Sequence, residues 1–187
     1  MKPAAIGLRS HSGWAALVSL AGTADAPAVI SRRRIVTADP EIPGSKQPYH
    51  FVEEMALSEA AAMVARCRES SLALAAAALT GERKRLAAEG FDASVCAVLQ
   101  GRTRDLPALE RILSSHPLLH TAEGIFYRLV LLEAAEAIGM RTLAVAERGI
   151  EESIPITRLT ELGRGLGSPW TVDQKYAAAA AWLALKQ

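Results

Sequence analysis

The sequence predicts an α/β protein with one mixed five-stranded sheet and helices on both of its faces. Two observations predict this class. Three short apolar runs separated by tight turns occupy the first 37 residues, which is typical of an antiparallel meander. Beyond residue 53, two further apolar runs alternate with long alanine- and leucine-rich segments, which is the pattern of parallel β–α units.

Length and composition favour a single domain over residues 1–187. Half of the residues are hydrophobic and 22% are charged, so the chain can bury a core without disulfides or metals. The net charge of +1 excludes a globally basic nucleic-acid binder and leaves a local basic patch open. Cys67 and Cys96 match no zinc-ligand or redox spacing, so we expect two buried free thiols.

The sequence shows no targeting signal and no membrane segment. The apolar stretch behind the first residues is interrupted by Arg9, Ser10 and His11, and no apolar run approaches the roughly 18 residues that span a bilayer. We therefore expect a cytoplasmic protein that has no membrane partner.

The first three strands are expected at residues 4–9, 14–20 and 28–37. The polar turn at residues 10–13 joins the first two strands as a hairpin. Three consecutive arginines, residues 32–34, indicate that the third strand is a partly exposed outer strand, because charge discourages edge pairing. Successive side chains in a strand face opposite ways, so these arginines favour solvated edge protection over a continuous nucleic-acid patch.

Helices dominate the rest of the chain. The proline-containing segment 39–48 is expected to be a loop, and strong helix propensity follows from about Glu53 to a stop at Gly90. The apolar run at residues 94–99 is typical of a strand buried on both faces. The remaining expected elements are helices at 107–113 and 118–138, a strand at 142–145 and a final helix from the capping box of Thr171 and Gln174 to about Ala184.

This order, β-β-β-α-β-α-β-α, resembles the ribonuclease H-like fold over essentially the whole chain. Right-handed crossovers would place strands four and five parallel to strand one. The stretch Gly7-Leu-Arg-Ser-His-Ser-Gly-Trp-Ala15 is also similar to the first hairpin of Holliday-junction resolvases, which ends in a Ser/Thr-Gly-aromatic-small segment. Nucleases of this fold cut phosphodiesters with two divalent cations held by carboxylates, one of them from the first strand.

The chain departs from that carboxylate pattern. No acidic residue precedes Asp25, and the fourth strand ends in Leu-Gln-Gly-Arg. A guanidinium repels a cation, so the sequence disfavours a metal-dependent nuclease, and we assign no metal and no cofactor. Nuclease activity remains an alternative only if other carboxylates replace the missing ligands and together hold two cations about 4 Å apart. The available ones are Glu53, Asp105, Glu123 and Glu147.

The carboxyl ends of strands one, three, four and five point to the same edge of the predicted sheet, where open α/β sheets bind ligands. Polar side chains follow each of these strands. They are Arg9, Ser10 and His11 after the first, His50, Glu53 and Glu54 after the third, Gln100, Arg102, Arg104 and Asp105 after the fourth, and Glu147 and Arg148 after the fifth.

A second group consists of His116, His120 and Glu123, which share one helical face through spacings of four and three. Pro117 disfavours helix at His116 and places that residue in the turn before the helix. Such residues can bind a metal, form an acid–base pair or make an ordinary helical hydrogen bond. Two histidines and one glutamate are too few for a metal site without a further donor.

We predict an anion-binding site for a nucleic acid or a phosphorylated small molecule at the carboxyl edge of strands one and four. Its ligand-binding residues are Arg9, Arg102 and His116, and its candidates for orienting the ligand or transferring a proton are His120, Glu123 and His11. Whether the protein is an enzyme stays open. The alternative is a non-catalytic interaction protein that forms a homodimer or docks a partner through alanine-rich helices, such as residues 177–181 with Trp182.

Overall fold

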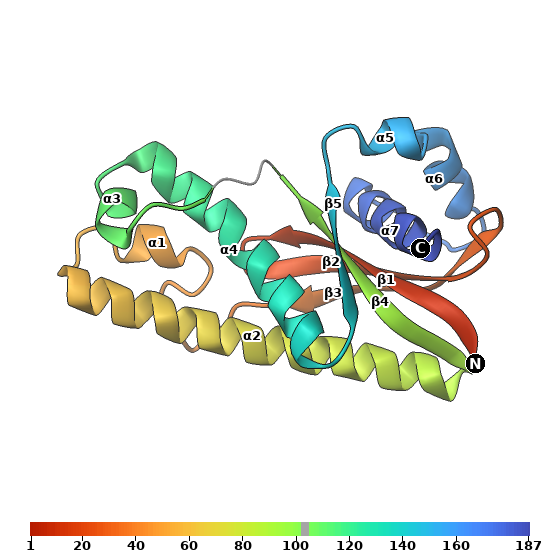
Figure 1. Ribbon diagram of the computed structural model, residues 1–187, viewed down its shortest axis with the longest axis horizontal. Helices are drawn as coiled ribbons and strands as arrows, with labels where there is room; N and C mark the ends of the chain where they lie inside the picture. Colours follow the sequence, from red (N-terminus) through yellow and green to blue (C-terminus); the bar gives the residue numbers. More distant parts are fainter. Residues whose placement is uncertain (102–104) are drawn as a thin grey trace.

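The computed structural model describes residues 1–101 and 105–187 and contains a five-stranded sheet with helices on both faces (Figure 1). The strands are β1 (Lys2–His11), β2 (Trp14–Gly22), β3 (Pro27–Val36), β4 (Phe91–Gln100) and β5 (Arg141–Ala146). Their order across the sheet is β3-β2-β1-β4-β5. β2 pairs antiparallel with β1 and β3, whereas β4 pairs parallel with β1 and β5. The predicted meander, parallel units and outer position of β3 are therefore confirmed.

Two long helices cover one face of the sheet, and a third covers the other face (Figure 1). The first two are α2 (Leu57–Ala88) and α4 (His116–Ala137), and the third is α7 (Val172–Leu185), with α5 (Ile150–Ser153) and α6 (Ile156–Leu162) nearby. Two short helices, α1 (Pro48–Phe51) and α3 (Leu109–Leu113), lie beyond the carboxyl edge of the sheet and contact α4. None of the described helices is both long and apolar enough to cross a membrane.

Two helix starts differ from the predictions. The predicted helix from Glu53 begins later, at Leu57, because the chain turns after Val52, and the short helix α1 at Pro48–Phe51 was not predicted. The prediction that His116 precedes its helix is also wrong, since His116 is the first residue of α4. Pro117 is tolerated there because the first N–H groups of a helix have no intrahelical acceptor.

The contact between β1 and α7 requires a glycine. Side chains alternate along a strand, so Gly7 faces α7 while Ile6 and Leu8 face α2 and α4. A Cβ atom on Gly7 would lie 1.9 Å from the backbone oxygen of Ala177. The alanines at 177–181 are fully buried against the sheet. The prediction that this run contacts a partner is therefore wrong, because this chain already covers it.

A buried carboxylate joins α2 to β2 and β3. Glu82 is 3% exposed, and its Oε1 accepts hydrogen bonds from Ser19 Oγ at 2.7 Å and Arg85 Nη2 at 2.8 Å. Its Oε2 lies 3.0 Å from Nε of Arg33. Burial alone would raise the pKa of Glu82, but hydrogen bonds from Arg85, Ser19 and Ser31 outweigh it and lower that pKa.

The triple arginine of β3 is split between the two faces, as predicted. Arg33 pairs with Glu82 of α2, whereas Arg32 donates a hydrogen bond of 2.6 Å to the backbone oxygen of Leu166 on the α7 side. The guanidinium of Arg34 covers the ring of Trp14 at 4.0 Å. Each of these arginines has a partner within the chain, so they do not form one continuous patch.

The variant Glu82→Gln is expected to lower the free energy of unfolding at neutral pH by about 2–3 kcal/mol, because it removes the buried charge that holds two arginines. The lowered pKa makes this contribution complete above the ordinary value of 4.5, and it is lost as the pH falls through the folded-state pKa. Urea unfolding of both proteins at neutral and acidic pH measures the difference, which is expected to shrink in acid.

The matched control is Glu89→Gln, whose carboxylate pairs with Arg85 but is 49% exposed. It is expected to cost at most about 0.5 kcal/mol, as surface ion pairs generally do. Equal losses in the two variants, or an undiminished Glu82→Gln deficit in acid, would contradict this account of Glu82.

Candidate functional site

Two polar clusters lie at the carboxyl edge of the sheet. The first, called here the Arg9 cluster, consists of Arg9, His11, Glu147 and Asp173. The second, the histidine cluster, consists of His50, His116 and His120. The sequence predicted one pocket for residues of both clusters. The structure places Arg9 between carboxylates on the α7 side of β1, whereas His11, His50 and His120 line one cavity beside the N-terminal part of α4.

The Arg9 cluster follows from the alternation along β1. Arg9 faces α7 like Gly7, two residues before it, and its guanidinium lies between two carboxylates. Nη2 donates to Oε1 of Glu147 at 2.6 Å, and Nη1 donates to Oδ1 of Asp173 at 2.7 Å. Asp173 occupies the first turn of α7, where the helix dipole favours a negative charge. All three side chains are partly buried, so solvent screens these pairs incompletely.

Aromatic rings surround this ion-paired group. Nε2 of His11 lies 2.9 Å from Oδ1 of Asp173, and the imidazole stacks on Trp14 with centroids 4.2 Å apart. The guanidinium of Arg9 lies 4.8 Å from the ring centre of Tyr176. The hydroxyl of Tyr176 donates to Glu151 at 2.5 Å, and this hydrogen bond raises the pKa of Tyr176. Arg9 and His11 are therefore held by partners within the chain.

The histidine cluster joins α1 to α4. His116 and His120 are four residues apart on α4, and their Nε2 atoms are 3.0 Å apart. The ring of His50, from α1, lies 4.7 Å from the ring of His120 and 5.9 Å from that of His116, measured between centroids. One ring nitrogen of each histidine lies within 4.8 Å of those of the other two. His116 and His120 are exposed and His50 is half-buried, so the cluster opens to solvent on one side.

Glu123 fixes α1 against α4. It is 7% exposed, and its Oε1 accepts hydrogen bonds from the backbone N–H groups of Tyr49 at 2.7 Å and His50 at 3.1 Å. The same oxygen lies 3.3 Å from Nδ1 of His50. Burial raises the pKa of Glu123, and the hydrogen bonds from His50 and Tyr49 oppose that rise only in part. Of the three alternatives that the sequence left open, an ordinary hydrogen bond within the helix does not describe Glu123, because Glu123 is buried and accepts its hydrogen bonds from α1.

A cavity of about 270 Å³ lies between the β1–β2 hairpin, α1 and α4. All three residues predicted to orient a ligand or move a proton, His11, His120 and Glu123, line it. The full lining is Ser10, His11, Ser12, Gln47, His50, His120, Glu123, Gly124, Tyr127 and Arg128. The cavity thus presents imidazoles, one buried carboxyl group and one guanidinium.

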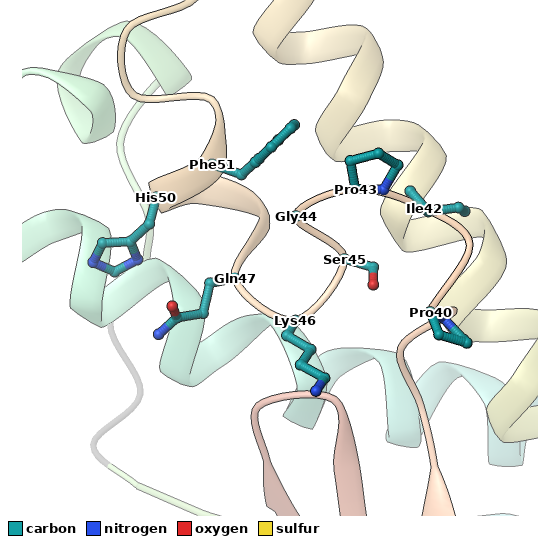
Figure 2. A pocket seen from close by; sticks show the side chains of 9 residues that line it. All are labelled: Pro40, Ile42, Pro43, Gly44, Ser45, Lys46, Gln47, His50 and Phe51. Atoms are coloured by element: carbon teal, nitrogen blue, oxygen red, sulfur yellow. The ribbon is translucent and has the colours of Figure 1, made fainter.

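The loop between β3 and α1 shapes this region. Its residues, together with His50 and Phe51, line a separate hollow of about 570 Å³, and Figure 2 shows Lys46 extending toward the β1–β2 hairpin. From α1, His50 and Phe51 point in opposite directions (Figure 2). The loop is tied down by hydrogen bonds from the backbone N–H groups of Thr37 and Ala38 to the carbonyl of Gly13. The course of this loop places His50 next to α4.

Asp173 was not predicted as a site residue. His50 was predicted only as one of the polar side chains that follow the third strand at the carboxyl edge, without a partner. A helix N-terminus with an acidic residue was the available signal for Asp173, while nothing local paired His50 with His120. Arg102, predicted to bind the ligand, lies outside the described residues, as does Arg104.

The carboxylates proposed as replacement metal ligands do not meet. Across residues 1–101 and 105–187, the side chains placed to share one ion are the three histidines. Glu123 faces α1, and Glu147 pairs with Arg9. Neither belongs to a set of carboxylates that can hold two cations.

Two solved structures have the same fold. T. thermophilus RuvC in complex with a Holliday junction substrate matches with a TM-score of 0.60 and 11% identity, over 97% of this chain and 92% of that one. A second Thermus thermophilus RuvC structure matches with a TM-score of 0.54 and 12% identity, over 97% and 93% of the two chains. Neither a family model nor a curated protein matches the sequence. The predicted ribonuclease H-like fold is therefore confirmed.

Proposed function

We propose that this protein binds nucleic acid at the carboxyl edge of its sheet and does not cut it by two-metal chemistry at the end of β1. The observation that carries the proposal is the guanidinium of Arg9 between Glu147 and Asp173. Arg9 lies on the first strand, which supplies a metal-binding carboxylate in the nucleases that the sequence resembles.

Electrostatics argues against a cation at this position. A divalent ion bound to Glu147 and Asp173 would face the positive charge of Arg9, which already lies 2.6 Å and 2.7 Å from their oxygens. Binding the ion would require displacing Arg9 and breaking both of its pairs. The carboxylates are neutralised by a fixed side chain instead of by a metal.

Positive side chains near the edge support binding of phosphates. Arg128 lines the 270 Å³ cavity, and Lys46 packs beside the hairpin turn at Gly13. In the described part of the chain neither forms an ion pair, so both charges are available to a phosphate backbone. A protein of the same fold, RuvC, has been solved with a Holliday junction substrate. These observations favour nucleic acid as the ligand.

A phosphorylated small molecule is the second candidate, because Arg128 and three histidines line one cavity. Its volume of about 270 Å³ is slightly below the range of about 300–1,000 Å³ that is usual for small-molecule pockets. The cavity is therefore better suited to a single phosphate group than to a whole nucleotide.

Fluorescence anisotropy with labelled four-way junction, duplex and single-stranded DNA tests the proposal. We expect binding that weakens with salt, and no cleavage with Mg²⁺ or Mn²⁺. Arg128→Gln and Lys46→Gln are each expected to weaken binding and to reduce the slope of log affinity against log salt by about 1.

The matched control is Lys84→Gln, because Lys84 is exposed near Met1 and Phe91 at the opposite edge of the sheet. It is expected to leave both affinity and salt slope unchanged. Absence of binding to all three DNAs at low salt, or equal effects of the three substitutions, would count against a nucleic-acid site at the carboxyl edge.

A further inference from the structure

Three of the four histidines of this chain meet at one place, although they come from two elements that are far apart in sequence. Hydrogen bonds to Glu123 connect these elements across 73 residues. His116 and His120 are four residues apart on α4, the spacing at which two histidines of a helix face one zinc ion. His50 supplies the further donor that the helix alone lacks.

We propose that His50, His116 and His120 bind one Zn²⁺ ion, with Glu123 positioning His50. Three nitrogen donors select zinc over magnesium or calcium, which prefer oxygen ligands. Three protein ligands leave the fourth tetrahedral position open to water or to an anion. This site is separate from the Arg9 cluster, and the proposal does not depend on nucleic-acid binding.

The distances are compatible with tetrahedral zinc. A Zn–N bond of about 2.0–2.1 Å places two ligand nitrogens about 3.3 Å apart. The Nε2 atoms of His116 and His120 are already 3.0 Å apart, and the ligand nitrogens of all three lie within 4.8 Å of one another. His116 and His120 are exposed, so small side-chain rotations can close the remaining gap without repacking the core.

The hydrogen bonding of His50 prepares one nitrogen for a metal. Its Nδ1 lies 3.3 Å from Oε1 of Glu123, and a carboxylate only accepts, so this contact favours the tautomer in which Nδ1–H donates a hydrogen bond to Glu123. Its Nε2 is buried and has no hydrogen-bond partner among the described residues. Histidines that bind zinc usually donate the N–H of their other ring nitrogen to a carboxylate or a carbonyl, as His50 can to Glu123. Glu123 therefore orients the imidazole and increases its basicity.

The test uses the full-length protein without a histidine tag, stripped of metal with a chelator. Competition with a chromophoric zinc chelator is expected to give one Zn²⁺ per chain. The double variant His116→Ala/His120→Ala is expected to bind at least about 100-fold more weakly, since loss of a single outer-shell partner already costs about 10–100-fold. Both residues are exposed, so thermal unfolding without metal is expected to be unchanged.

Co²⁺ substitution reports the coordination directly. The wild type is expected to show the intense visible absorption of four-coordinate Co²⁺, and Thr121→Ala on the same helix is expected to retain it. Glu123→Gln keeps a hydrogen-bond acceptor without the charge, so it is expected to shift the Co²⁺ bands and weaken Zn²⁺ binding about 10-fold. A purely structural Glu123 would change the unfolding temperature and leave the bands in place.

Two results would overturn the proposal. One is wild-type zinc affinity no greater than that of the double variant, which would place any bound metal elsewhere. The other is a wild-type Co²⁺ spectrum typical of six-coordinate, hydrated metal, which would mean that the three imidazoles do not bind it together.

Discussion

Gly7→Ala is expected to prevent this protein from folding stably. The added Cβ would lie 1.9 Å from the backbone oxygen of Ala177 and 2.6 Å from the backbone nitrogen of Ala181. Overpacking a core usually costs about 1–3 kcal/mol when side chains can yield. Here helix α7 itself must move, so we expect a loss of more than about 3 kcal/mol, a large part of the 5–15 kcal/mol of a typical domain.

Soluble expression, circular dichroism and urea unfolding measure this effect. The matched control is Gly81→Ala in α2, where an added Cβ meets nothing within 4 Å. That substitution is expected to stabilise the protein by up to about 1 kcal/mol, because alanine favours a helix more than glycine does. If the two variants were equally stable, α7 could not pack on β1 as closely as described.

Arg9→Asp is expected to turn the Arg9 cluster into a divalent-cation site. The substitution removes both ion pairs and places a third carboxylate near Glu147 and Asp173. Without metal, repulsion among these groups is expected to cost about 2–3 kcal/mol, or roughly 5–10 °C in unfolding temperature. Millimolar Mn²⁺ or Mg²⁺ is expected to restore much of that loss, because clustered carboxylates are the ligands these ions prefer.

Thermal unfolding with and without Mn²⁺ provides the measurement. Arg9→Gln serves as the control, since it also loses the ion pairs but adds no carboxylate, and Mn²⁺ is expected to leave it unchanged. Strong stabilisation of the wild type by Mn²⁺ would argue against the proposed function, because it would mean that the ion displaces Arg9. A lack of response in Arg9→Asp would mean that the three carboxylates cannot converge.

Local patterns in the sequence were sufficient for most of the fold. The hairpin between β1 and β2, the buried run within β4 and the capping box of Thr171 and Gln174 all appear in the structure as predicted, although the hairpin turn is confined to residues 12–13. These features depend on residues that are neighbours in the chain, and the element order then restricts the sheet topology. Even the division of the arginines at 32–34 between two faces follows from strand geometry alone.

Local rules were less reliable at element boundaries. Pro117 was expected to exclude His116 from the helix, yet α4 begins at His116, because the first turn of a helix needs no N–H donors. The short helix α1 was also missed, since a single turn has almost no periodicity of its own. Its place depends on hydrogen bonds from Tyr49 and His50 to Glu123, which lies on a different helix.

The strands, the main helices, the outer position of β3 and the missing acid on the first strand can all be read from local sequence patterns. Which polar groups meet depends on the tertiary packing. Arg9 and Asp173 are 164 positions apart, and His50 and Glu123 are 73 apart. Their contacts depend on how α7 packs on β1 and where the loop before α1 runs, and both are set by burial of apolar surface that no local pattern encodes.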